Sequence, residues 1–370
     1  MKASLSVLII DDSRAMRALI EDILGSQSDI SIVGSVFSAA KAYEILQRTP
    51  PDIVTIDLAM PSLDGTKILK EIQKINALQP RGRSIGILAI SEDLTVGSEG
   101  ALKALQQGAF DVLEKPLLVP NETISQAFSA SLIDKIRTYS QRREGNYKVV
   151  SRVESDPVGG SSMDKARLSN ERTPIRGIMI AASTGGPKAL STLLPELVKL
   201  VNLPIVIVQH MPLGFTTSLA ESLSSALPWP VHEARDAERV EPKTIYIAPS
   251  GRHLHIRQHA EQHLMLALSD DVPESGCKPS ANVLYRSAAN HLGSGVLAII
   301  LTGMGDDGVK GLMAVRSSGG YVIAQDEASS VVWGMPGAAV NAGAVDKICP
   351  LSDIPSMVFS VINGRDRRST

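Results

Sequence analysis

The sequence predicts two α/β domains in one chain, each built on a doubly wound parallel sheet. Two observations indicate this class. First, the chain has 370 residues, 44% of them hydrophobic, which is more than one ordinary core accommodates, so two domains are expected. Second, short β-branched apolar runs alternate along the chain with stretches whose apolar residues recur at helical spacing. This alternation is typical of βαβ units and therefore of parallel sheets.

The first half of the chain accounts for the first domain, predicted over residues 1–125. Continuous apolar runs indicate buried parallel strands over 6–10, 53–56 and 85–90. Apolar residues at helical spacing indicate helices between them, over 13–26 and 65–75.

A linker is predicted over residues 126–174, because the stretch 141–174 is rich in Ser, Gly, Arg and Glu and has no sustained hydrophobic period. The second domain is predicted over residues 175–370. Its expected strands lie at 176–183, 203–210, 244–249, 295–303 and 320–326. Its clearest expected helices lie at 187–200, 216–227 and 281–292.

Composition disfavours several classes of protein. A net charge of −2 gives no reason to expect bulk binding to nucleic acid or to an anionic membrane. No apolar run approaches the roughly 20 residues of a membrane span, and the N-terminal residues lack a signal peptide's apolar core. The two cysteines form no metal-binding or redox pair by spacing. We therefore expect a cytoplasmic protein.

Polar residues follow the predicted strands of the first domain, where a doubly wound sheet gathers its functional groups. Asp11 and Asp12 follow the first strand, Asp57 and Ser91 follow the next two, and Lys115 follows the short run DVLE. Three converging carboxylates repel one another unless a cation lies among them, and oxygen ligands suit Mg²⁺. A carboxylate there can attack a phosphoryl donor, while Ser91 and Lys115 contact the phosphoryl oxygens. The alternative is that loop aspartates such as Asp12 cap helices.

The motifs IIDDS, IDLAMPSLDG, AIS and EKP occur in that order, and in them the first domain resembles the receiver domain of two-component response regulators. The resemblance implies a flavodoxin-like fold, Asp57 as phosphoacceptor, and Mg²⁺ held by Asp11, Asp12 and Asp57. It also implies Ser91 and Lys115 as switch residues and a histidine kinase as phosphodonor.

Two positions depart from the receiver pattern. Val112 stands three positions before the lysine, where receivers often carry an aromatic switch residue, and Ala59 stands where an acidic residue is common. Phe110 is near Val112, and a regular strand would place both on one face of the sheet.

Reactive residues end three predicted strands of the second domain: Ser183, His210 and the pair Asp306 and Asp307. Serine, histidine and aspartate meeting at one sheet edge form a nucleophile, a base and an orienting carboxylate. Each also has a structural alternative. Ser183 can cap the following helix, His210 can be an interior histidine, and the acidic pair can be a polar loop or a weak cation site. The sequence around Ser183 matches neither a nucleotide-binding glycine loop nor the G-x-S-x-G elbow.

The motifs AASTGGP, VQHMPLGFT and LTGMGDDG resemble the catalytic domain of the chemotaxis protein-glutamate methylesterases. The resemblance implies a Rossmann-like three-layer α/β/α hydrolase domain that needs no cofactor. It makes Ser183 the nucleophile, His210 the general base and Asp307 the residue that orients the imidazole. The backbone N–H groups near Thr184 and Met304 are expected to form the oxyanion hole.

The activity implied is hydrolysis of glutamate γ-methyl esters on the cytoplasmic helices of methyl-accepting chemoreceptors, with deamidation of receptor glutamines as a second activity. Phosphorylation of the receiver is expected to expose a covered active site. Two other functions stay open: a phosphorylation-dependent binding adaptor with an inert hydrolase domain, and a DNA-binding regulator, which the α/β second half disfavours. His253, His255, His259 and His263 are interpreted as surface residues rather than metal ligands.

Overall fold

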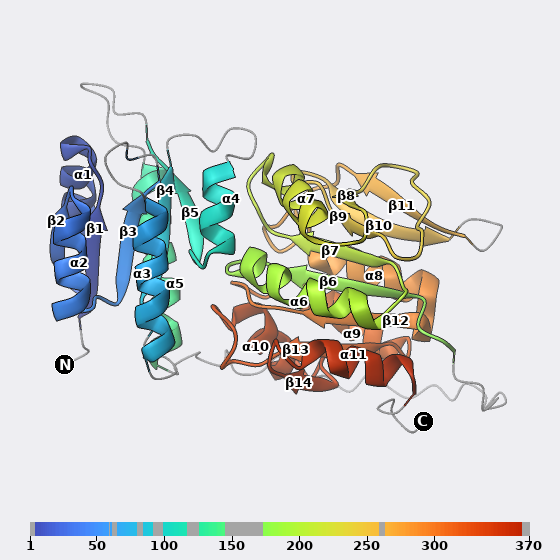
Figure 1. Ribbon diagram of the computed structural model, residues 1–370. Coiled ribbons are helices and arrows are strands. Elements are labelled where there is room, and N and C mark those ends of the chain that lie inside the picture. Colours follow the sequence, from blue (N-terminus) through green and yellow to red (C-terminus); the bar gives the residue numbers. More distant parts are fainter. Residues whose placement is uncertain are drawn as a thin grey trace, which may run out of the picture.

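The computed structural model describes residues 4–58, 60, 65–79, 84–91, 99–116, 126–144, 173–258 and 263–364. Two α/β units lie side by side, each with a parallel sheet of its own (Figure 1). The predicted fold class is therefore confirmed. No helix among the described residues is both long and apolar enough to cross a bilayer.

The first unit is a five-stranded parallel sheet in the order β2-β1-β3-β4-β5. Its strands are β1 (Leu5–Ile10), β2 (Ile30–Val36), β3 (Ile53–Asp57), β4 (Gly86–Ser91) and β5 (Asp111–Glu114). Its helices are α1 (Arg14–Gly25), α2 (Ala39–Arg48), α3 (Gly65–Leu78), α4 (Glu99–Gln106) and α5 (Gln126–Glu144). Helices α1 and α5 pack on one face of the sheet, and α2, α3 and α4 on the other.

Helix α5 occupies the first part of the predicted linker, so that part of the linker prediction is wrong. The helix buries Phe128, Leu132, Ile136 and Tyr139 against the first sheet. These residues recur at helical spacing and form one apolar stripe, a pattern that the Ser- and Arg-rich sequence after it obscured. The remainder of the predicted linker, up to residue 172, lies outside the described residues.

The second unit has a seven-stranded parallel sheet in the order β14-β13-β12-β6-β7-β9-β8. Its strands are β6 (Gly177–Ala182), β7 (Ile205–Gln209), β8 (Val231–Glu233), β9 (Ile245–Ile247), β12 (Val296–Ile300), β13 (Tyr321–Gln325) and β14 (Lys347–Cys349). Its helices are α6 (Gly186–Leu200), α7 (Phe215–Ala226), α8 (Ala281–Leu292), α9 (Val309–Ser317), α10 (Gly334–Asn341) and α11 (Ile354–Ile362).

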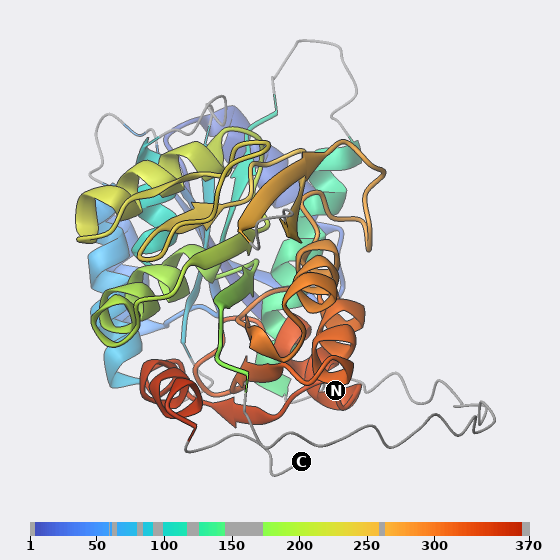
Figure 2. The same cartoon turned by 90° about the vertical axis from the view of Figure 1, so that its right-hand side faces the viewer.

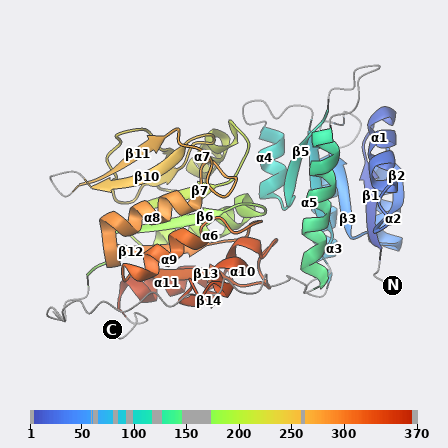
Figure 3. The same cartoon turned by 180° about the vertical axis from the view of Figure 1, so that it is seen from behind.

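Three layers result, with helices on both sides of the second sheet (Figure 2). Helices α6, α7 and α11 share one hydrophobic core with the sheet. Helices α8, α9 and α10 share the other core, together with an antiparallel hairpin of β10 (His253–Gln258) and β11 (Leu264–Ser269). Figure 3 shows α8, α9 and this hairpin from behind.

The hairpin corrects the interpretation of the histidine-rich segment. His253 is 1% exposed, and its ring bonds to the carbonyl of Val272 and the N–H of Ser280, so it is not a surface residue. His255 and His263 are partly exposed, as expected. His259 lies outside the described residues.

Helix α4 of the first unit packs against α6 and α7 of the second (Figure 1). Leu102, on α4, is buried in the core that α6 and α7 form. Gln106, at the end of α4, donates a 2.9 Å hydrogen bond to the hydroxyl of Ser222 on α7. The first unit therefore docks on the second through α4.

Candidate active site

The predicted carboxylates of the first unit meet at the carboxyl edge of its sheet. Asp57 ends β3, Asp11 follows β1, and both are 1% exposed. Lys115 follows β5 and places its Nζ 2.6 Å from Asp57 Oδ2 and 3.3 Å from Asp11 Oδ2. Ser91 ends β4 at the same edge, and its carbonyl accepts the N–H of Lys115.

The carboxylate cluster fits a divalent cation. Asp11, Asp12 and Asp57 each offer an oxygen, and these oxygens lie within 4.8 Å of one another. Burial raises the pKa of Asp11 and the charge of Asp57 raises it further, although the Ser13 N–H and Lys115 offset part of this rise. One lysine, Lys115, stands against three aspartates in this cluster, and oxygen ligands are those that Mg²⁺ prefers. Asp12 does not cap the following helix, because the N-cap of α1 is Ser13.

Lys115 is held as a cation by the same cluster. Burial lowers its pKa, but the hydrogen bond to Asp57 and the charges of both aspartates raise it above its ordinary value overall.

Val112, at the usual position of the aromatic switch residue, and the nearby Phe110 lie on opposite faces of the sheet. Val112 packs with α2, α3 and α4, whereas Phe110 packs with α1 and α5 and stacks on Tyr139.

Ser183 lies between the end of β6 and the start of α6, as the sequence predicts. It does not cap α6, because the N-cap is Gly185, whose φ of 76° is left-handed. A side chain at Gly303 would place its Cβ 2.7 Å from that of Ser183. Only glycine therefore lets the loop after β12 approach the serine this closely.

His210 and Asp307 are brought together from distant parts of the chain. The His210 Nε2–H donates to Asp307 Oδ2 over 2.9 Å, and the Asp307 side chain is only 2% exposed. Burial lowers the pKa of His210, but hydrogen bonds with Asp307 and Cys277 and their charges raise it to about 9 overall. Burial raises the pKa of Asp307, but hydrogen bonds from His210 and Ser280 bring it below its ordinary value. Asp307 is therefore an ionised partner that stabilises the imidazolium form of His210.

The N-terminus of α8 holds the Asp307 carboxylate. Ser280 Oγ donates to Oδ1 over 2.6 Å, the Ala281 N–H donates to Oδ2 over 2.7 Å, and the Asn282 N–H donates to Oδ1 over 3.2 Å. Unpaired N–H groups at a helix start favour an anion there. Sequence reasoning gave these residues no role, although a Pro-Ser pair before a helical pattern is a capping signal.

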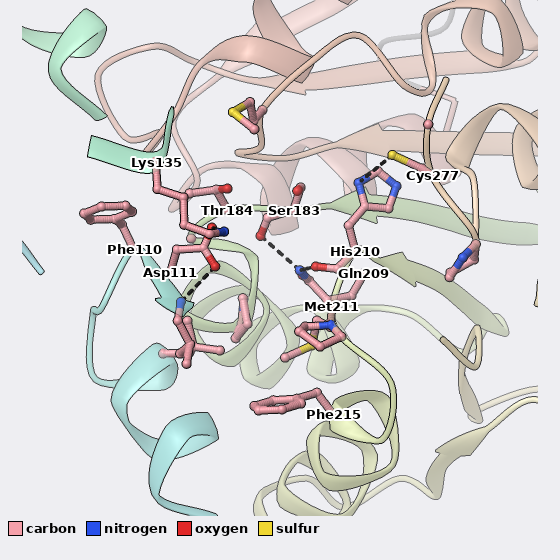
Figure 4. Close-up of a pocket in the computed structure, with 18 of the residues that line it drawn as sticks. Phe110, Asp111, Lys135, Ser183, Thr184, Gln209, His210, Met211, Phe215 and Cys277 are labelled. Carbon is pink, nitrogen blue, oxygen red and sulfur yellow. Dashed lines mark hydrogen bonds and ion pairs between the residues drawn. The ribbon is translucent and has the colours of Figure 1, made fainter. Parts of the chain in front are cut away.

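No hydrogen bond joins Ser183 Oγ to His210 in the part of the chain that the structure describes. Both residues line one cavity (Figure 4). The amide of buried Gln209 fixes their backbones, because its Nε2 donates to the carbonyls of Ser183, over 2.9 Å, and of His210, over 3.0 Å. The sequence analysis gave Gln209 no role, because it stands inside the predicted strand over 203–210.

The backbone N–H groups of Thr184 and Met304 have no acceptor among the described residues, and both residues line the same cavity. The hydroxyl of buried Thr302 donates to the carbonyl of Thr184 over 3.0 Å, which fixes that stretch of loop. Two unused donors in the cavity that Ser183 lines are candidates for an oxyanion hole.

The cavity of about 370 Å³ lies between the two units. The second unit contributes Ser183, Thr184, His210, Cys277 and Met304, with others. The first unit contributes Leu105, Phe110, Asp111, Val112 and Lys135. Figure 4 shows Phe110, Asp111 and Lys135 on the side of Ser183 that faces the first unit. The first unit therefore forms one side of the cavity that Ser183 lines.

Comparison with known proteins agrees with both halves. Residues 178–358 match the CheB methylesterase family, and residues 7–127 match the response regulator receiver domain. The protein-glutamate methylesterase/protein-glutamine glutaminase of Desulfitobacterium hafniense (strain Y51) is 33% identical over 397 residues, covering 98% of this chain and 99% of that protein.

Protein-glutamate methylesterase/protein-glutamine glutaminase 1 of Syntrophomonas wolfei subsp. wolfei is 37% identical over 368 residues, covering 96% of this chain and 99% of that protein. The crystal structure of the Thermotoga maritima CheB methylesterase catalytic domain is 38% identical and covers 50% of this chain and 98% of that chain, with a TM-score of 0.49. Because these relatives match the chain over nearly its whole length, the chain belongs to the CheB family of protein-glutamate methylesterases, with a response regulator receiver domain before the methylesterase domain.

Proposed function

We propose that this protein is a phosphorylation-regulated serine esterase that hydrolyses glutamate γ-methyl esters on chemoreceptors and releases methanol. The observation that carries the proposal is the meeting of Ser183, His210 and the buried Asp307 at one sheet edge, beside two unused N–H donors. This arrangement suits acyl transfer to a serine.

In the first step, Ser183 Oγ attacks the ester carbonyl and His210 takes its proton. Because the Nε2–H of His210 donates to Asp307, the neutral ring carries its lone pair on Nδ1, and Nδ1 is the base. This step requires a side-chain rotation that places Ser183 Oγ within hydrogen-bond distance of Nδ1. The ionised Asp307 stabilises the imidazolium that forms. The N–H groups of Thr184 and Met304 stabilise the oxyanion.

Collapse of the tetrahedral intermediate breaks the bond to the methoxy oxygen, and the Nδ1 proton leaves with methanol. Water then attacks the acyl-enzyme, gives its proton to Nδ1, and Ser183 is released with that proton. The products are a receptor glutamate and methanol. A receptor glutamine differs in its leaving group, so the same steps release ammonia, which accounts for a glutaminase activity.

The receiver controls access to the serine. It supplies one side of the cavity in this structure, so a receptor helix cannot reach Ser183 until the receiver moves. Phosphorylation of Asp57 by a histidine kinase weakens this docking. Asp11, Asp12 and Asp57 would hold Mg²⁺, which when bound offsets the negative charge of the carboxylates and the phosphoryl group. Lys115, 2.6 Å from Asp57 Oδ2, would pair with the phosphoryl group.

A methanol-release assay tests the function. Membranes that carry receptors with radiolabelled methyl esters are incubated with the wild-type protein, the Ser183→Ala variant and, as a control, Ser224→Ala, which alters an exposed serine on α7. Wild type and Ser224→Ala should release labelled methanol, and Ser183→Ala should not. Absence of release by phosphorylated wild type would favour a phosphorylation-dependent adaptor with an inert hydrolase domain.

A further inference from the structure

Cys277 lies beside the catalytic histidine and has no part in the mechanism above. Its Sγ is 3.8 Å from His210 Nδ1, within hydrogen-bonding geometry of the ring (Figure 4). Cys277 is partly exposed and lines the same cavity as His210. A thiol therefore faces the ring nitrogen that must accept the proton of Ser183.

The tautomer of His210 makes Nδ1 an available ligand. The Asp307 carboxylate is ionised and can only accept hydrogen bonds, so the neutral imidazole carries its proton on Nε2. Nδ1 then presents a lone pair on the side of the sulfur. A deprotonated Cys277 adds a thiolate, which is a soft ligand that zinc-class ions prefer and Mg²⁺ does not.

The distance between the two atoms fits one bridging ion. With Zn–N of about 2.0 Å and Zn–S of about 2.3 Å, a tetrahedral ion separates its nitrogen and sulfur ligands by about 3.5 Å. The observed separation is 3.8 Å, so only a small movement is needed. Asp307, on the far nitrogen of the ring, supplies the carboxylate that commonly orients a zinc-binding histidine. His210, Cys277 and Asp307 each offer one ligand atom, and these three atoms lie within 4.8 Å of one another.

We propose that His210 Nδ1 and Cys277 Sγ form a binding site for a divalent zinc-class cation, and that its occupation inhibits the enzyme. Binding displaces the thiol proton to solvent, and water in the cavity completes the coordination. An ion on Nδ1 removes the base from the reaction. The inhibition rests on the proposed esterase function, whereas the binding of metal does not.

Binding is tested on the full-length protein with Co²⁺ as the spectroscopic probe and excess Mg²⁺ present to occupy the receiver carboxylates. A thiolate ligand gives Co²⁺ a near-ultraviolet charge-transfer absorption. Wild type should show this band, and Zn²⁺ should abolish it. Cys277→Ser and His210→Ala should lack the band, and Cys349→Ala, which removes the other cysteine, should keep it. A band that persists in Cys277→Ser would overturn the site, as would its absence in wild type.

Inhibition is tested by titrating Zn²⁺ into the methanol-release assay, with the rate of each variant divided by its own rate in the presence of a chelator. Half-inhibition of Cys277→Ser should need at least about tenfold more Zn²⁺ than wild type or Cys349→Ala, which corresponds to about 1.4 kcal/mol. Equal sensitivity of all three proteins would refute the inhibitory role. If none of them releases methanol, the proposed function fails, while the cobalt spectrum still decides whether the metal site exists.

Discussion

The backbone N–H of Gly185 donates a 3.1 Å hydrogen bond to the carbonyl of Phe110. Gly185 is the N-cap of α6, two residues after Ser183, and Phe110 directly precedes β5. The receiver thus contacts the chain two residues from Ser183, in addition to docking α4 against α6 and α7. Displacement of the receiver would release both contacts together.

Weakening this docking should raise the activity of the unphosphorylated protein. Leu102 of α4 is buried in the core of the second unit and is absent from the cores of the first, so Leu102→Ala removes interface packing. A buried Leu→Ala change costs about 2–5 kcal/mol, so basal methanol release should rise by about tenfold or more if the closed state predominates. Steady-state methanol release without phosphodonor measures the effect.

The control for this variant is Lys103→Ala, which changes an exposed residue of the same helix. Its basal methanol release should equal that of the wild type.

A fragment that starts at Thr173 lacks the receiver altogether. It retains buried Ile175 and every strand of the second sheet. It should hydrolyse faster than the unphosphorylated full-length protein and should not respond to phosphodonor. A folded fragment that is slower than the whole protein would mean that the receiver activates rather than covers the enzyme.

The catalytic residues should differ in how much activity their loss removes. Ser183→Ala and His210→Ala should each reduce kcat by several orders of magnitude. Residues that act as a unit fail together, so the loss of one costs about as much as the loss of all. Asp307→Asn should lose less, since Asp307 orients and stabilises the imidazole without reacting. Single-turnover methanol release measures all three, and wild-type rates for Ser183→Ala would exclude this nucleophile.

Ser280 should affect catalysis through Asp307. Ser280→Ala removes a 2.6 Å hydrogen bond to a buried carboxylate, and hydrogen bonds to charged groups contribute about 1.5–3 kcal/mol. We expect kcat to fall by about tenfold or more with little change in KM. Ser280→Thr, which keeps the hydroxyl, should retain more activity than Ser280→Ala. Equal loss in both variants would indicate a packing defect instead.

Activity should depend on pH through His210, whose pKa is raised to about 9. A general base works only in its neutral form, which predominates above its pKa, so kcat/KM should rise with pH up to about 9 and then level off. Asp307→Asn removes a negative partner of the imidazolium and should move this inflection to lower pH. A pH–rate profile of both proteins decides, and an inflection unchanged by Asp307→Asn would contradict the pairing.

Phosphorylation should occur at one receiver aspartate and need Mg²⁺. A radiolabelled small phosphodonor such as acetyl phosphate should label the wild type in Mg²⁺ and not after chelation, because the clustered carboxylates repel the donor. Asp57→Asn should abolish labelling and keep basal esterase activity. Asp134→Asn, an exposed carboxylate on α5, serves as the control and should be labelled normally. Label retained in Asp57→Asn would place the phosphorylation site elsewhere.

The sequence by itself determined the two α/β units and the residues at the ends of their strands. Alternating apolar runs and helical stripes predict parallel sheets, and parallel strands carry the residues that follow them to one edge. This is why Asp11, Asp57 and Lys115 meet in one unit, and His210 and Asp307 in the other. The motifs alone also predict that a receiver unit comes first in the chain and a hydrolase unit follows it.

Only the tertiary structure decided what depends on contacts between distant segments. Helix α5 is part of the first unit because its apolar stripe packs on the first sheet, a contact that the residues of α5 alone do not indicate. The burial of His253 depends on pairing between β10 and β11. The hydrogen bonds from the α8 N-terminus to Asp307 and the position of Cys277 beside His210 bring together residues 25 to 67 positions apart. The receiver side of the cavity around Ser183 depends on the packing of α4 into the core of the second unit. Periodicity reports which face of an element is buried, but not which surface buries it.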